Sequence, residues 1–236
     1  AEKWNQRSER NENTGMSGKY NNIKVVSFDM DGTILNTEAD LEAAARRALK
    51  LAGLPPMPPV RFANYIGNGV KGIYRDLCPD ATQEKLEEAV RYQLEWYPEH
   101  CTEQTCFYPG MWETLQWMAA KGIRLVIVTN KVETTAKKLA NHFCSDLPFE
   151  EVWGNDQDRP LKPDPIAGKL LCETLGVTPD QVMHVGDGET DMQFAKNAGF
   201  VGIGVSWGYR STDVLWKSGA DVMIDEPWQL CELLDR

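Results

Sequence analysis

Two aspartates follow an apolar run near the beginning of the chain, within residues 25–36, VVSFDMDGTILN. The run VVSF predicts a buried strand, and Asp29 and Asp31 follow its end, with Gly32 directly after them. Like charges two positions apart repel each other, and burial of either carboxylate costs free energy unless a cation compensates. This stretch therefore predicts a carboxylate site that binds a cation.

Other polar side chains follow further apolar runs in the same way. They are Thr129, Asn130 and Lys131 in VTNK, Lys162 in LKPDP, and Asp187 and Asp191 in GDGETD. Because ligands of parallel α/β sheets bind off the carboxyl ends of the strands, these groups should converge with Asp29 and Asp31 at one rim. Four carboxylates, a hydroxyl and a lysine at one rim indicate chemistry rather than packing.

Short apolar runs alternate with helical patterns from residue 23 onward, which is typical of a parallel α/β sheet. The predicted strands are residues 23–28, 124–128, 151–153, 181–185, 201–205 and 221–224. We therefore expect a Rossmann-like parallel sheet with helices on both faces, which would hold the polar residues at its rim.

A segment of about seventy residues separates the first two predicted strands and contains no predicted strand of its own. Its helical patterns cover residues 38–51, the stretch PPVRFANYIG, and residues 70–77 and 82–99. An ordinary crossover needs far fewer residues, so we expect an inserted helical cap. The predicted domains are a polar tail at 1–22, disordered or left over from expression, a cap at 38–108, and a core at 23–37 and 109–236.

The composition argues against several classes of protein. The 236 residues are 42% hydrophobic and carry a formal net charge of −10, without a basic cluster for nucleic acid or an anionic membrane. The apolar runs are too short to span a bilayer. Six cysteines without a CxxC pair, and no apolar signal segment, favour the reducing cytoplasm. We expect a monomer or homodimer whose partner is a small molecule.

Four motifs, DMDGT, VTNK, LKPDP and GDGETD, occur in this order at the predicted strand ends. In this order they resemble the motifs of the haloacid-dehalogenase superfamily of phosphohydrolases, over nearly the whole chain after the tail. Each motif alone is weak, but four in order are specific. The resemblance implies a phosphatase with a Rossmann-like core and a cap.

The resemblance also implies a role for each acidic residue. Asp29 would be both nucleophile and metal ligand, with Mg²⁺ supplying the charge that lets a carboxylate approach a phosphate. Asp31 would serve as general acid and then base, while its backbone carbonyl ligates the metal. Asp187 is expected to ligate the metal, and Asp191 to ligate it or to orient a bound water or Lys162. Lys162 would offset the charge on Asp29 and the phosphoryl group.

The phosphate is expected to bind at the second motif and after the first. The Thr129 hydroxyl and the Asn130 N–H group would hold it at a helix N-terminus, although a threonine there is also a common helix cap. Gly32 would permit a tight turn and leave backbone N–H groups free for phosphate oxygens. His184 lies within a strand pattern and is expected to be a packed core residue rather than a base.

The cap suggests the substrate. Residues 64–77, NYIGNGVKGIYRDL, resemble a cap segment of the phosphoglycolate phosphatase family. The resemblance implies a small phosphorylated acid, with 2-phosphoglycolate leading, and Asn68, Lys71 or Arg75 near its carboxylate. Gly67 and Gly69 could equally mark only a turn between helices.

Other activities of the superfamily stay open, namely pyrophosphatase, sugar-phosphate phosphatase and phosphomutase. From a different class, the chain could be a non-catalytic regulator that binds a phosphorylated ligand, since a fold does not determine function. Asp31 argues against a dehalogenase proper and a phosphonate-cleaving enzyme, because both lack an acid at that position.

Overall fold

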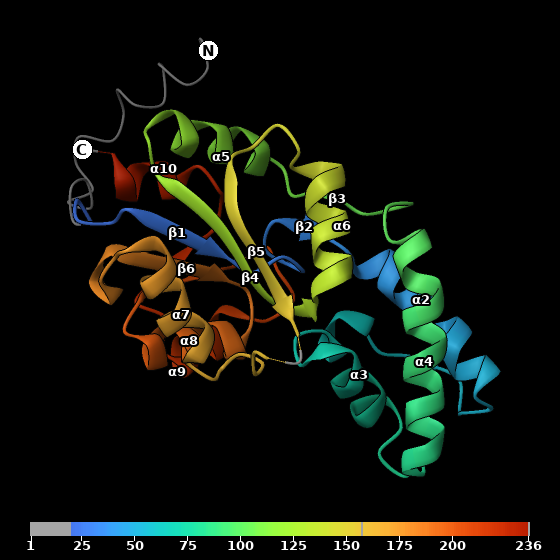
Figure 1. Cartoon of the computed structure of the whole chain (residues 1–236). Coiled ribbons are helices and arrows are strands. Elements are labelled where there is room, and N and C mark those ends of the chain that lie inside the picture. Colours follow the sequence, from blue (N-terminus) through green and yellow to red (C-terminus); the bar gives the residue numbers. More distant parts are fainter. Residues whose placement is uncertain (1–19, 157, 236) are drawn as a thin grey trace.

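A computed structural model describes residues 20–156 and 158–235 (Figure 1). Most of the predicted tail, residues 1–19, lies outside the described residues. Residues 20–22, the last three of the predicted tail, form a turn on the folded core, where Tyr20 is buried and Asn22 donates to the carbonyl of Asp180 at 2.7 Å. The prediction that the tail extends to residue 22 is therefore wrong at its end.

A six-stranded parallel sheet forms the centre of the molecule, in the order β5-β4-β1-β6-β7-β8. Its strands are β1 (Val25–Phe28), β4 (Arg124–Val132), β5 (Phe149–Asn155), β6 (Val182–Gly186), β7 (Val201–Val205) and β8 (Val222–Ile224). After β1, the chain adds β4 and β5 on one side of it and then β6, β7 and β8 on the other side. The strand order therefore reverses beside β1, which is where such sheets bind ligands.

Alternate residues of the central strands pack on opposite faces of the sheet, as the two-residue period of a strand requires. Val26 and Phe28 join one hydrophobic cluster, whereas Val25 joins the other. The first cluster includes side chains of α5 (Met111–Ala120), α6 (Glu133–Phe143) and α10 (Gln229–Leu234), and the second includes those of α7 (Ile166–Leu175) and α8 (Glu189–Ala198). Helices thus cover both faces, and the predicted fold class is confirmed.

The shorter elements complete the connections of this core. They are η2 (Pro179–Gln181), before β6, and α9 (Thr212–Ser218), between β7 and β8. Among the described residues, no helix combines the length and the apolar character needed to cross a membrane.

The helices of the insert lie beyond the carboxyl ends of the strands, where the arrowheads of β4 and β5 point toward α3 (Figure 1). They are α2 (Glu38–Leu51), η1 (Phe62–Tyr65), α3 (Gly69–Leu77) and α4 (Gln83–His100). A cluster of their own, which includes Leu49, Tyr74 and Ala89, holds them together. They therefore form a cap over the rim of the sheet.

Two features of the insert differ from the sequence prediction. The stretch PPVRFANYIG, whose prolines cannot donate backbone hydrogen bonds, forms only the short 3₁₀ helix η1. The segment also contains a strand, β3 (Cys106–Phe107), which pairs antiparallel with β2 (Leu35–Asn36). This two-stranded ribbon joins the chain where it enters and leaves the cap helices.

Candidate active site

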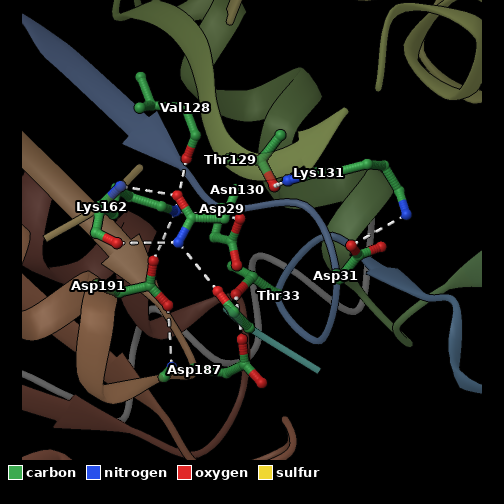
Figure 2. Close-up of polar contacts among 12 residues, drawn as sticks. Asp29, Asp31, Thr33, Val128, Thr129, Asn130, Lys131, Lys162, Asp187 and Asp191 are labelled. Carbon is green, nitrogen blue, oxygen red and sulfur yellow. Dashed lines mark hydrogen bonds and ion pairs between the residues drawn. The ribbon is translucent and has the colours of Figure 1, made fainter. Parts of the chain in front are cut away.

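Three buried carboxylates meet at the rim of the sheet (Figure 2). Asp29 directly follows β1, and its N–H group donates to the carbonyl of Val185 in β6 at 2.9 Å. Asp187 and Asp191 follow β6, and one carboxylate oxygen from each of the three aspartates lies within 4.8 Å of the others. The expected convergence of Asp29, Asp187 and Asp191 is thus present in the structure.

Lys162 supplies a buried positive charge to this cluster. Its Nζ lies 2.7 Å from Asp191 Oδ1 and 3.1 Å from Asp29 Oδ1, and it donates to the Val128 carbonyl at 2.7 Å. Burial would favour the neutral amine, but the two carboxylates outweigh it and raise the pKa of Lys162. The ammonium therefore stays charged beside Asp29.

The pKa values of the three aspartates differ because the positive charge of Lys162 does not act on them equally. Burial raises the pKa of Asp29 to about 6 against the opposing charge of Lys162. Burial also raises the pKa of Asp187 well above its usual range. Burial acts in the same direction on Asp191, but Lys162 and a hydrogen bond from His184 outweigh it and lower the pKa of Asp191. The positive charges near Asp29 and Asp187 therefore do not compensate for the burial of these two carboxylates.

A divalent metal ion fits this donor set. Asp29 Oδ1 is buried and has no well-directed hydrogen-bond partner among the described residues, although the Lys162 ammonium lies near it. Asp29, Asp187 and Asp191 would offer hard carboxylate oxygens, which magnesium, calcium and manganese prefer. A bound cation would relieve the repulsion that burial creates between them.

Asp187 is held in place by the loop after β7 and by the first motif. Its Oδ2 accepts from the Tyr209 N–H group at 2.7 Å, and its Oδ1 accepts from the Thr33 hydroxyl at 3.2 Å. Gly32 has a φ of +80°, and a Cβ there would lie 2.2 Å from Asp187 Oδ2. Only glycine therefore allows this approach. The Gly32 N–H group donates to the Leu35 carbonyl at 2.9 Å, so this group is not free for phosphate. That other backbone N–H groups of the turn face phosphate oxygens stays a prediction.

The Asp31 side chain points away from the carboxylate cluster, toward Lys131 (Figure 2). Its Oδ2 lies 3.0 Å from Lys131 Nζ, and its Oδ1 accepts from the Thr37 hydroxyl at 2.6 Å. The carboxylate therefore does not join the three metal-binding candidates, and metal ligation through the backbone carbonyl stays a prediction. This placement suits a separate role in proton transfer.

The sequence predicted that Thr129 and Asn130 lie at a helix N-terminus, and this prediction is wrong. Strand β4 continues to Val132 and α6 begins at Glu133, so neither residue caps the helix. The extension carries both residues past the end of β1, where they line the same cavity as Asp29. A contact from the Thr129 hydroxyl favours the ionised form of Asp29 and so opposes the rise of its pKa.

Asn130 has a positioning role that the sequence did not reveal. Its Oδ1 accepts from the Lys162 N–H group at 2.7 Å, and its Nδ2 donates to the Lys162 carbonyl at 3.0 Å. The same Nδ2 donates to the carbonyl of Gly67 in the cap at 2.9 Å. Asn130 therefore ties the backbone of the lysine to the cap.

His184 is fully buried in β6, and its predicted packing role is confirmed. Its Nδ1 lies 2.9 Å from the Ser27 hydroxyl and its Nε2 lies 3.3 Å from Asp191 Oδ1. Burial lowers the pKa of His184, which keeps the ring neutral. The ring orients Asp191 from behind.

A cavity of about 580 Å³, part of it open to solvent, separates the cap from Asp29 and Asp31. The structure does not bring Asn68, Lys71 and Arg75 to this cavity: all three are exposed and none lines it. Their assignment to the substrate was drawn from the cap motif alone, and no contact in the described residues supports it.

The polar residues that do line the cavity include Lys131 from the core and Gln93 and Tyr97 from α4. Lys131 was recognisable as a rim residue because it follows Asn130 in VTNK, although the sequence assigned it no role. Gln93 and Tyr97 carry no such signal, since α4 contains many other polar residues and two further aromatic ones, Tyr92 and Trp96.

Comparison with known proteins identifies the family. A model of the haloacid dehalogenase-like hydrolases matches residues 26–205. The chain belongs to the haloacid dehalogenase-like hydrolases. This finding confirms the resemblance drawn from the four motifs, and the matched region covers both the core motifs and the cap.

Relatives of this haloacid dehalogenase-like hydrolase share nearly its whole length. It is 31% identical over 217 residues to a phosphoglycolate phosphatase of Chromobacterium violaceum, covering 90% of this chain and 96% of that one. A phosphoglycolate phosphatase of Aquifex aeolicus is 30% identical over 213 residues, covering 90% and 97%. The solved structure of a predicted phosphoglycolate phosphatase from Haemophilus somnus has a TM-score of 0.82 at 28% identity, covering 90% and 98%. The protein is a phosphatase of this family.

Proposed function

We propose that this phosphatase is a Mg²⁺-dependent phosphomonoesterase that acts through a phosphorylated Asp29, with 2-phosphoglycolate as its substrate. The observation that carries the proposal is the Asp29 carboxylate, buried at a strand end beside Lys162 and two further carboxylates. The names of the relatives support the choice of substrate. Asp29, Asp187 and Asp191 would hold the ion.

In the first step, an Asp29 oxygen attacks phosphorus and the bond to the leaving oxygen breaks. Lys162 holds Asp29 in place and offsets charge on the phosphoryl group, while Asp31 gives a proton to the leaving oxygen. In the second step, Asp31 takes a proton from a water that attacks the phosphorus, and Asp29 leaves as a carboxylate. When bound, Mg²⁺ would offset the negative charge of the carboxylates and phosphate oxygens.

A substrate panel tests the proposed function. Phosphate release should be measured at saturating magnesium from 2-phosphoglycolate, glucose phosphates, nucleotides, pyrophosphate and a nitrophenyl ester. We expect kcat/KM for 2-phosphoglycolate to exceed the others by about a hundredfold, or about 2.7 kcal/mol of discrimination. Equal rates across the panel would contradict the choice of substrate, and no release from any compound would contradict a catalytic role.

Magnesium binding should weaken as the pH falls through about 6. Burial raises the pKa of Asp29 to about 6, so below that pH the carboxyl is protonated and a proton competes with the metal. We expect Kd to rise by at least about tenfold per pH unit below that point, because metal binding displaces the proton of Asp29, and Asp187, whose pKa burial also raises, adds to the effect. Titration calorimetry at pH 5.0, 5.5 and 7.5 measures this directly, and a Kd that is constant over this range would contradict the assignment.

The Kd for magnesium also predicts how metal removal changes the stability of the fold. At a concentration of a hundred times Kd, magnesium should stabilise the fold by about 2.7 kcal/mol. A chelator should abolish phosphate release, and excess magnesium should restore it. Potassium chloride at matched ionic strength serves as the control, since simple screening would act equally with both salts.

A further inference from the structure

The wall of the cavity opposite Asp29 is mostly apolar. Ile66, Val70, Ile73 and Leu94 of the cap line it, and these side chains exclude water without binding a polar group. Specific recognition of a leaving group must therefore come from the few polar side chains that share the cavity.

Gln93 presents an amide donor to this cavity. The residue is 3% exposed, and its Oε1 accepts a hydrogen bond from the hydroxyl of the fully buried Tyr74. Because the carbonyl is occupied, the Nε2 group remains. No hydrogen bond from it occurs among the described residues, and it is not one of their fully buried unpaired atoms, so it is open to the cavity that Gln93 lines. An amide N–H group that opens on a cavity without a protein partner is available to donate to a ligand there.

Lys131 and Tyr97 add donors next to Gln93. The Lys131 ammonium pairs with Asp31 and donates to the Tyr97 hydroxyl at 3.1 Å, which leaves one of its three hydrogens. The Tyr97 oxygen acts as acceptor in that bond, so its own hydrogen is available to the cavity. Burial raises the pKa of Tyr97 well above its usual value, so the phenol stays protonated.

We propose that Gln93, Tyr97 and Lys131 form a donor-only subsite that binds a carboxylate on the leaving group, with Gln93 as the residue that determines specificity. A carboxylate accepts hydrogen bonds and cannot donate them, so it complements three groups that offer only hydrogens. Lys131 contacts Asp31, the acid for the leaving oxygen, so the subsite lies within reach of a carboxylate one carbon away from that oxygen. This inference rests on the proposed function and assigns its substrate recognition.

The test compares 2-phosphoglycolate, ethyl phosphate and phosphoethanolamine in steady-state kinetics with the magnesium-loaded enzyme. These leaving groups end in a carboxylate, a methyl and an ammonium group. Gln93→Glu replaces the donor by an acceptor of almost the same shape. We expect the ratio of kcat/KM for 2-phosphoglycolate to that for ethyl phosphate to fall about 10- to 100-fold, because a hydrogen bond to a charged group is lost. Phosphoethanolamine should gain relative to both.

Two further variants separate recognition from structural damage. Tyr74→Phe removes only the hydroxyl that orients the Gln93 amide and should lower the same ratio several-fold. Gln116→Glu adds the same charge at an exposed site of α5 and should leave the ratio unchanged. Thermal denaturation verifies that each variant is folded.

The outcomes distinguish this inference from the proposed function. If the wild type prefers 2-phosphoglycolate but neither Gln93→Glu nor Tyr74→Phe alters the ratio, the subsite is refuted and the proposed function stands. If the wild type hydrolyses ethyl phosphate as well as 2-phosphoglycolate, the proposed substrate itself is refuted. A fall in the ratio together with a gain for phosphoethanolamine supports both.

Discussion

Replacement of Asp29 by asparagine should reduce kcat for phosphate release by about a thousandfold or more, because the amide cannot form the phosphorylated intermediate. Asparagine has almost the same shape, so the binding of phosphate esters should survive better than turnover. Single-turnover kinetics with 2-phosphoglycolate, and trapping of labelled phosphate on the protein, would follow both steps.

The same variant should be more stable than the wild type when metal is absent. Burial raises the pKa of Asp29 from 3.8 to about 6, so the ionised carboxylate destabilises the fold above pH 6, and this penalty disappears as the pH falls toward 4. The shift corresponds to about 3 kcal/mol at most, or several degrees in Tm at pH 7.5. The comparison requires a chelator, because bound metal would reverse the order.

A matched control is Asp80→Asn, which removes the same charge from an exposed loop between α3 and α4. It should retain the activity and the Tm of the wild type. Near-normal turnover by Asp29→Asn would refute Asp29 as the nucleophile, whereas a metal-free Tm well below that of the wild type would refute the repulsion within the carboxylate cluster.

Replacement of Lys162 by methionine should impair both activity and folding. Methionine fills similar space without the charge, so Asp29 and Asp191 lose the ammonium that lies 3.1 and 2.7 Å from them. Loss of one partner of a buried ion pair costs about 3–5 kcal/mol. Loss of a preorganised charge beside the phosphoryl group should lower kcat by about 10²- to 10³-fold.

Urea denaturation and steady-state kinetics measure these two effects separately. High magnesium should restore part of the stability, since the metal offsets the same carboxylates, but it should not restore kcat. Lys169→Met, at an exposed site of α7, is the matched control and should change neither quantity. Wild-type kcat in Lys162→Met would exclude a contribution of the ammonium to catalysis.

Much of the core and its chemistry was predictable from local patterns. Short runs of three to six residues indicated the strands, and strand β7 begins and ends where predicted. The acidic residues follow strand ends directly, so a parallel sheet must bring Asp29 and Asp187 to one rim. Lys162 was predictable as well, because its place in the order of motifs is a property of the chain.

Contacts that depend on long-range packing were not predictable. Strand β4 continues past Thr129 because, after an irregularity that follows Val128, Val132 pairs with Asn155 of β5, and no local signal marks this pairing. The ribbon of β2 and β3 consists of only two residues on each side, too few to show a period. The sequence predicted that Gly32 helps to bind phosphate, but its N–H group donates to the Leu35 carbonyl within the turn that Gly32 permits.

The cap shows most clearly which features follow from the sequence and which follow from the tertiary structure. By itself, the sequence determined that a helical insert follows the first strand and that carboxylates, a lysine and a threonine gather at the strand ends, because these follow from chain order and periodicity. Only the tertiary structure decided which cap residues face the site. The packing of α3 against α4 turns Lys71 and Arg75 outward and Gln93 and Tyr97 inward, and burial against distant side chains controls this choice.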